Sequence, residues 1–219
     1  MLNTQFALYT KATTIRGRDG NTKEYLELLK KALAVTLPNF DEKALAKHRL
    51  SYYEIKIINQ LAGYYAEQES ENARKRGLRM YKNLAKTMDT YIVDENEKMR
   101  MYEAVLYNYS KFLGLSKQYK KTLQVIAEGE KSTQGHARLI SLPGFAINRA
   151  CCTLELGQKQ ESLPFFALAF YGVVIFAKYG DTDGVRGIFD YVKAHFGIEF
   201  DYSEDYLATG LSGIIKNVL

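Results

Sequence analysis

The side chains able to do acid–base, metal or redox chemistry are scattered along this chain of 219 residues. His48, His136 and His195 are far apart and none has a second ligand at helical spacing, so a zinc site is not expected. Cys151 and Cys152 are adjacent, which makes a disulfide between them strained and rules out a CxxC motif. The chain has no GxSxG, GxGxxG or phosphate-loop motif. We therefore predict a binding module and not an enzyme, with no catalytic residue, metal or cofactor.

Carboxamide side chains, in contrast, recur at equivalent places. They stand two or three residues before a small residue of a helical segment: Asn59 and Gln60 before Ala62, Asn108 before Ser110, and Asn148 before Ala150. A carboxamide both donates and accepts hydrogen bonds, so it suits the main-chain amides of an extended peptide. The alternative is that these residues form hydrogen bonds to neighbouring helices of the protein itself.

The elements that carry these residues are expected to be helices. Apolar residues repeat at helical intervals almost throughout, as in Ile55, Ile58, Ala62 and Tyr65, and no run has the two-residue period of a strand. Breaks in the pattern fall at residues 18–21, 37–42, 68–72, 93–97, 132–144, 156–160 and 180–183. The chain is thus predicted to be all-α, with roughly nine helices and no strand.

The helices come in copies. Ala62, Ser110 and Ala150 lie 48 and 40 residues apart, and each is followed by a second helix with a common pattern of a small residue, an apolar pair and a second small residue. These second helices begin at Gly77-Leu78-x-Met80-Tyr81, Thr122-Leu123-x-Val125-Ile126-x-x-Gly129 and Ser162-Leu163-x-Phe165-Phe166-x-x-Ala169. Small residues let paired helices approach closely, and one hairpin cannot bury its apolar face alone, so the copies are expected to stack as a solenoid. We predict a single domain, 1–219, with repeats near 22–36, 52–90, 99–131 and 144–178 and a C-terminal capping region, 183–219.

This repeated pattern of small and apolar residues resembles the tetratricopeptide repeat. Over about residues 52–197 the chain also resembles the sensor half of the peptide-responsive Rgg/PlcR-like transcription regulators, mainly through YEIKIINQLAGYY (53–65), residues 105–131 and residues 147–170. The resemblance implies a right-handed superhelix of helical hairpins whose first helices line a concave groove. Members carry an XRE-type helix-turn-helix ahead of the repeats, whereas residues 1–50 here show no compact five-helix domain, so DNA contact is expected only through a module absent from this chain.

The resemblance places the carboxamide positions on the concave surface and so implies a peptide-binding site. The predicted contacts are Lys56, Asn59, Gln60, Tyr107, Asn108, Lys111, Asn148 and Arg149. The two lysines suit an acidic group or a peptide C-terminus. The implied function is regulatory peptide sensing, as in quorum sensing, in a cytoplasmic homodimer.

Composition supports a soluble intracellular protein. The formal charge is +5, but both signs are interleaved, and Arg74, Lys75, Arg76 and Arg79 are predicted to form a solvated helix face rather than a DNA-binding stripe. No signal sequence is apparent, and the longest uncharged stretch, 162–177, is shorter than the about 20 residues that span a bilayer. It is expected to be a buried helix, with a dimer face as the alternative.

Two other functions fit the repeats. One is a stand-alone scaffold that holds other proteins in the same groove. The other is a repeat protein that inhibits or dephosphorylates a response regulator, as some related bacterial repeat proteins do.

Overall fold

The computed structural model describes residues 2–92, 95–136, 141–177, 190, 192–194, 196–200 and 215–216. In these ranges the chain forms eight α-helices and a 3-10 helix in two compact units, Met1–Ser116 and Lys117–Leu219. The first unit contains α1 (Leu2–Asp19), α2 (Lys23–Ala34), η1 (Leu45–Lys47), α3 (Tyr52–Ala66), α4 (Glu71–Tyr91) and α5 (Glu95–Leu115). The second contains α6 (Tyr119–His136), α7 (Leu142–Glu155) and α8 (Lys159–Ala177). The predicted all-α class is confirmed, and the single domain stays a prediction.

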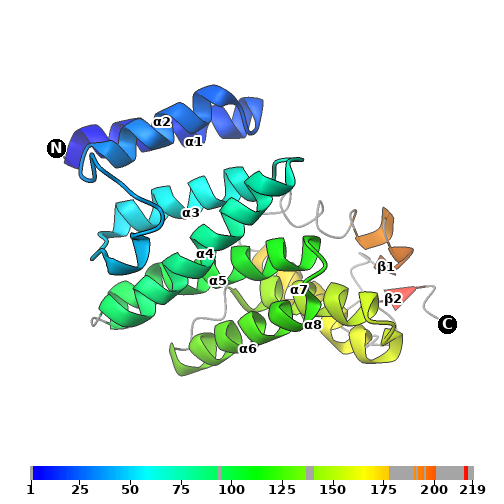
Figure 1. Ribbon diagram of the computed structural model, residues 1–219. Helices are drawn as coiled ribbons and strands as arrows, with labels where there is room; N and C mark the ends of the chain where they lie inside the picture. The colour runs from blue at the N-terminus through cyan, green and yellow to red at the C-terminus, as the bar shows by residue number, and fades with distance from the viewer. Residues whose placement is uncertain are drawn as a thin grey trace. The chain divides into compact units, whose positions relative to one another are not determined.

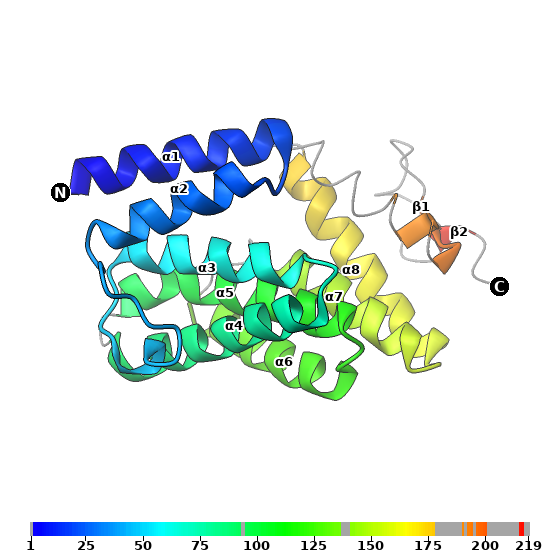
Figure 2. The ribbon, with the colours of Figure 1, turned by 45° about the horizontal axis from the view of Figure 1, so that its top comes forward.

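Neighbouring helices in sequence are neighbours in space within each unit. In the first unit α1 packs on α2, α2 on α3, α3 on α4 and α4 on α5, and α3 also contacts α5 (Figures 1 and 2). In the second unit α7 packs on both α6 and α8. Residues 2–47 form α1, α2 and η1, and not a five-helix domain.

One expectation about strands is wrong. Near the C-terminus β1 (Glu199–Phe200) pairs antiparallel with β2 (Ile215–Lys216). Strands of two residues are too short to produce a period-two pattern, which explains why the sequence does not reveal them. The break expected at 180–183 and most of the predicted capping region, 183–219, lie outside the described residues.

Local signals in the sequence set where the helices begin. Thr22 caps α2 by accepting a hydrogen bond from the main-chain nitrogen of Tyr25 at 3.2 Å. Ser51 and Glu54 form a reciprocal capping box at the start of α3, in which Ser51 N donates to Glu54 Oε2 at 2.6 Å. The α1–α2 turn passes through Gly20, whose φ of 75° is readily adopted by glycine.

The small residues of the repeat pattern are buried, as predicted. Ala62, Ser110 and Ala150 on the first helices are each 0% exposed, and Thr122 and Ser162 on the second helices are also buried. At Gly77 of α4 the neighbouring atoms belong to the backbone of α3: an added Cβ would lie 2.5 Å from Ala66 N and 2.6 Å from Ala62 O. Helices α3 and α4 therefore touch through their backbones.

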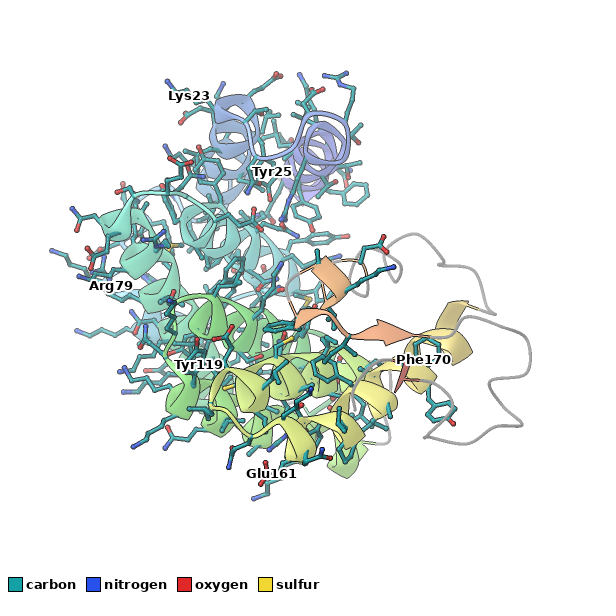
Figure 3. The ribbon with its side chains drawn as sticks, turned by 90° about the vertical axis from the view of Figure 1, so that its right-hand side faces the viewer. Lys23, Tyr25, Arg79, Tyr119, Glu161 and Phe170 are labelled. Carbon is teal, nitrogen blue, oxygen red and sulfur yellow. The ribbon has the colours of Figure 1, made fainter. Side chains whose placement is uncertain are left out.

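The space beside this contact is filled by large side chains. Tyr81, one turn after Gly77, stacks on Phe112 with 5.7 Å between ring centroids and on Tyr109 at 6.2 Å. The Tyr81 hydroxyl donates to the main-chain oxygen of Asn59 at 3.2 Å. Through these contacts of Tyr81, helices α3, α4 and α5 share one core. In Figure 3 Lys23 and Arg79 project outward from this unit, whereas Tyr25 lies among its helices.

The second unit has an aromatic core between α7 and α8. Phe166 and Phe170 are fully buried against Ala146, Ala150 and other small residues, and Val192 and Ile198 complete the cluster. Because Phe166 and Phe170 are buried within the unit, they cannot form the dimer face that was the alternative for this segment. The side chain of Phe176, its third proposed member, lies outside the described residues. Across the described part of the chain, no helix is both long enough and apolar enough to span a bilayer.

The backbone contact at Gly77 makes a testable prediction. Gly77→Ala should lower the free energy of unfolding by about 1–3 kcal/mol, because the new methyl group meets main-chain atoms that cannot rotate away. Gly17→Ala on α1 is the matched control, since Gly17 is exposed with nothing near its Cβ position, and it should raise that free energy by about 0.5–1 kcal/mol. Urea unfolding measures both. Stabilisation by both substitutions would contradict the contact.

Candidate functional site

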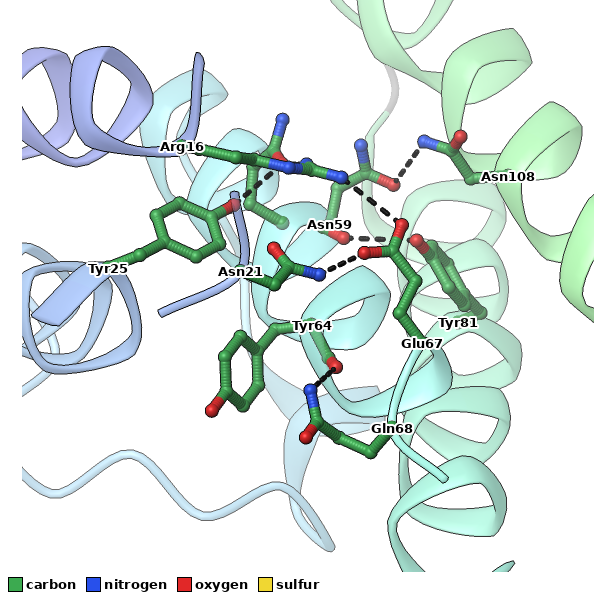
Figure 4. Close-up of polar contacts among 10 residues, drawn as sticks. Arg16, Asn21, Tyr25, Asn59, Tyr64, Glu67, Gln68, Tyr81 and Asn108 are labelled. Atoms are coloured by element: carbon green, nitrogen blue, oxygen red, sulfur yellow. Dashed lines mark hydrogen bonds and ion pairs between the residues drawn. The ribbon is translucent and has the colours of Figure 1, made fainter. Parts of the chain in front are cut away.

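Helix α3 carries two of the predicted contacts toward different neighbours. Asn59 and Gln60 are adjacent in sequence, so their side chains leave the helix in directions about 100° apart. Asn59 meets α5, whereas Gln60 meets α1 and α2 (Figure 4). At the same time, the main-chain oxygen of Asn59 accepts a hydrogen bond from the Tyr81 hydroxyl of α4.

The structure brings Asn59 and Asn108 together. Asn108 Nδ2 donates to Asn59 Oδ1 at 3.3 Å, between helices that belong to successive repeats. Asn59 is 6% exposed, and Asn108 is half-buried. Gln60, and not Asn59, stands in the position equivalent to Asn108 before the small residue, yet it is Asn59 that reaches α5. In the structure, Asn59 and Asn108 therefore form a hydrogen bond between neighbouring helices, which is the alternative to a ligand contact that the sequence left open.

Gln60 belongs to a polar network that the sequence did not reveal. Its Oε1 accepts from the Tyr25 hydroxyl at 2.8 Å and also from Arg16. Arg16 Nη2 lies 3.2 Å from Glu67 Oε1, and Asn21 Nδ2 donates to the other oxygen of Glu67 (Figure 4). The network ties the α1–α2 turn to the C-terminal end of α3. No signal in the sequence links Arg16 to Glu67, because the two are 51 residues apart and on different helices.

Lys56, one turn before Gln60, lies over aromatic rings. Its Nζ is 5.0 Å from the ring centroid of Tyr52 and 5.6 Å from that of Tyr9. Two cation–π contacts hold the Lys56 side chain against these rings. Next to them, Tyr53 makes an edge contact with Phe6, which is 50% exposed. This end of α3 therefore presents a positive charge among aromatic side chains.

The remaining predicted contacts of the first unit lie on α5. Tyr107 is half-buried, and burial raises the pKa of its hydroxyl. Lys111 is exposed, with its Nζ 5.2 Å from the ring centroid of Phe112. Together with Asn108, these side chains offer a donor, a carboxamide and a cation along one helix.

Asn148 and Arg149 lie on α7 of the second unit. Arg149 forms an ion pair with Glu130 of α6, in which its Nε donates to Oε1 at 3.1 Å, and its guanidinium lies 5.2 Å from the ring centroid of Phe165. Asn148 is half-buried. The structure thus brings together the Asn59–Asn108 pair in one unit, while Asn148 and Arg149 belong to the other.

Metal-ligating side chains in the described residues are dispersed, and the two cysteines are partly or fully buried. Among the described residues no group of three or more His, Cys, Asp or Glu side chains is placed to hold a metal ion. Burial raises the pKa of the Cys151 thiol to about 12 and that of Cys152 to about 11. Both thiols are therefore protonated at neutral pH and are poor nucleophiles. The carboxamides, Arg16 and Lys56 remain as groups suited to hydrogen bonds and charge recognition.

Helical hairpins that pack through small residues, and that carry carboxamides on their first helices, define a helical-repeat protein. Comparison with known families gives a match to the RNPP family C-terminal domain over residues 8–171, and the chain belongs to this family. This confirms the PlcR-like resemblance. No curated protein sequence matches the chain.

Two solved structures share the fold. One is Bacillus thuringiensis PlcR in complex with the peptide PapR7 and DNA, with a TM-score of 0.53, 17% sequence identity, and coverage of 84% of this chain and 69% of PlcR. The other is the apo form of the same protein, with a TM-score of 0.50, 17% identity, and coverage of 84% and 71%. At this identity the likeness concerns the fold.

The polar network predicts how stability depends on pH. Burial raises the pKa of Tyr25 to about 12, and it raises that of Tyr81 as well. An unfolded tyrosine ionises near pH 10, so between about pH 10 and 12 only the unfolded state releases these protons, and the free energy of unfolding falls as the pH rises.

Tyr25→Phe separates this contribution from general alkaline effects. Loss of the hydrogen bond to Gln60 should cost about 1 kcal/mol at neutral pH. The fall in stability above about pH 10 should become shallower than in the wild type, although Tyr81 preserves part of it. Urea unfolding at several pH values measures both effects. An identical pH slope in the two proteins would contradict the assignment.

Proposed function

We propose that the chain is the peptide-sensing regulatory domain of a bacterial transcription regulator. Membership of the RNPP family and the fold shared with PlcR, which is known in complex with the peptide PapR7 and DNA, support this role. The observation that carries the proposal is the Asn59–Asn108 pair, because carboxamides from two successive repeats meet where Asn108 is still partly open to solvent.

The pair works by exchange of hydrogen bonds. Before a ligand arrives, the bond between the two side chains provides a donor for Oδ1 of the buried Asn59 side chain. An extended peptide then replaces it: Asn108 donates to a peptide carbonyl oxygen, and Asn59 Oδ1 accepts from a peptide N–H. Each such exchange contributes about 0.5–1.5 kcal/mol, so affinity requires several contacts along the peptide.

The other predicted contacts extend this site in the proposal. Lys56 and Lys111 attract an acidic side chain or the peptide C-terminus. Tyr107 and Gln60 add hydrogen bonds beside Asn108 and Asn59. Asn148 and Arg149 provide the equivalent contacts on the first helix of a later repeat, within the second unit.

Regulation requires that the peptide distinguish two states. A peptide that binds one arrangement of the domain, or of a homodimer, tenfold more tightly shifts the equilibrium toward it by about 1.4 kcal/mol. DNA is reached only through a helix-turn-helix outside this chain. The domain therefore acts by transmitting a difference in binding energy and not by chemistry.

Selection from a random octapeptide library on the immobilised chain tests the proposal. The wild type should enrich peptides, and Asn108→Ala should weaken the enriched peptide about three- to tenfold in isothermal titration, because a hydrogen bond to the peptide main chain is lost. Asn83→Ala is the matched control: Asn83 is also half-buried, but it lies on α4 and donates to Glu42 O. It should leave the affinity unchanged.

Two results would overturn the proposal. One is a selection that enriches no peptide on the wild-type chain. The other is an enriched peptide that binds Asn108→Ala as tightly as the wild type.

A further inference from the structure

A cavity of about 300 Å³ lies in the first unit, apart from the Asn59–Asn108 pair. It is bounded by the C-terminal end of α2, the segment 37–42, and helices α3 and α4. Leu33 of α2 and Leu61 and Tyr65 of α3 form its buried wall, and Leu37 and Phe40 add apolar surface from the connecting segment. The cavity therefore has an apolar wall, beside polar groups elsewhere in its lining.

Three charged residues stand in the lining. Arg76 Nε donates to both carboxylate oxygens of Glu42 at 2.9 Å, and its guanidinium lies 3.8 Å from the ring centroid of Tyr65. Within the face expected to be solvated, Arg76 is thus ion-paired with 42% of its side chain exposed, whereas Arg74, Lys75 and Arg79 are exposed. The charges of Arg76 and Glu42 neutralise each other. The net positive charge of the lining residues therefore comes from Lys30.

Lys30 is available for a ligand. Its Nζ lies 2.8 Å from Glu27 Oε1, but both side chains are about half exposed, at 47% and 57%. An exposed ion pair of this kind contributes little to stability, so its cation can turn toward an anion at the cavity mouth at small cost.

We propose that this cavity binds a small aliphatic carboxylate, with the hydrocarbon chain against Leu33, Leu61 and Tyr65 and the carboxylate at Lys30. The volume of about 300 Å³ corresponds to about ten non-hydrogen atoms at about 30 Å³ each, which is the size of octanoate. The apolar wall excludes a fully polar anion, and the positive rim disfavours an amine of the same length. The site is independent of the proposed peptide-binding function.

Titration of the full chain with octanoate tests the proposal, with octylammonium as the probe of opposite charge. Octanoate should bind with a dissociation constant on the order of 0.1–1 mM, and octylammonium about tenfold more weakly. The measurement is isothermal titration calorimetry. No saturable octanoate binding, or equal binding of the two probes, would overturn the proposal.

Two variants locate the ligand. Lys30→Glu should weaken octanoate about tenfold, whereas Lys23→Glu makes the same charge change at an exposed position of α2 outside the cavity and should leave binding unchanged. Ala34→Phe should block the cavity from an exposed lining position, whereas Ala7→Phe, also exposed but on α1, should not. Equal effects within either pair would overturn the assignment.

N-acetylleucine distinguishes a free acid from the C-terminal residue of a peptide. It carries the same carboxylate on a short branched group. Octanoate should bind more tightly because its chain fills the cavity. Tighter binding of N-acetylleucine would overturn the assignment to a free aliphatic acid.

Discussion

The backbone contact between α3 and α4 at Gly77 is the constraint on which the first unit depends. It allows Tyr81, one turn further along α4, to reach the carbonyl oxygen of Asn59 and to stack on Phe112 of α5. A larger residue at position 77 would separate the helices and remove both contacts together. The position of Asn59 is therefore determined by packing on the same face of its own helix, where Ala62 and Ala66 follow it by three and seven residues.

The same helix also carries the polar residues. Asn59 and Gln60 take part in separate hydrogen-bonded groups, one with α5 and one with α1 and α2, so α3 connects every helix of the first unit. Buried carboxamides are costly unless they have partners, and the observed bonds provide them without a ligand. A peptide bound at the proposed site would therefore replace bonds that already exist, which favours ligands that offer donors and acceptors in regular alternation.

Helices, repeats and buried small residues could be predicted from the sequence because they depend on local periodicity. Ala62, Ser110 and Ala150 were identifiable from the repeated pattern of small and apolar residues, and each is fully buried. Pairing between side chains could not be predicted in the same way. Neither the choice of Asn59 over Gln60 as the partner of Asn108 nor the Arg16–Glu67 ion pair follows from a period, since both depend on how helices cross. The two-residue strands were too short to leave a pattern.

The central claim is that close packing against α4 holds α3 in place and so prepares its carboxamides for a ligand. Native-state hydrogen exchange at increasing urea concentration tests it most directly. The account predicts that the amides of residues 58–66 of α3 and 78–88 of α4 exchange with the same opening free energy and the same denaturant dependence, as one cooperative unit. Exchange of the α3 amides through a separate opening of lower free energy, while α4 stays protected, would contradict it.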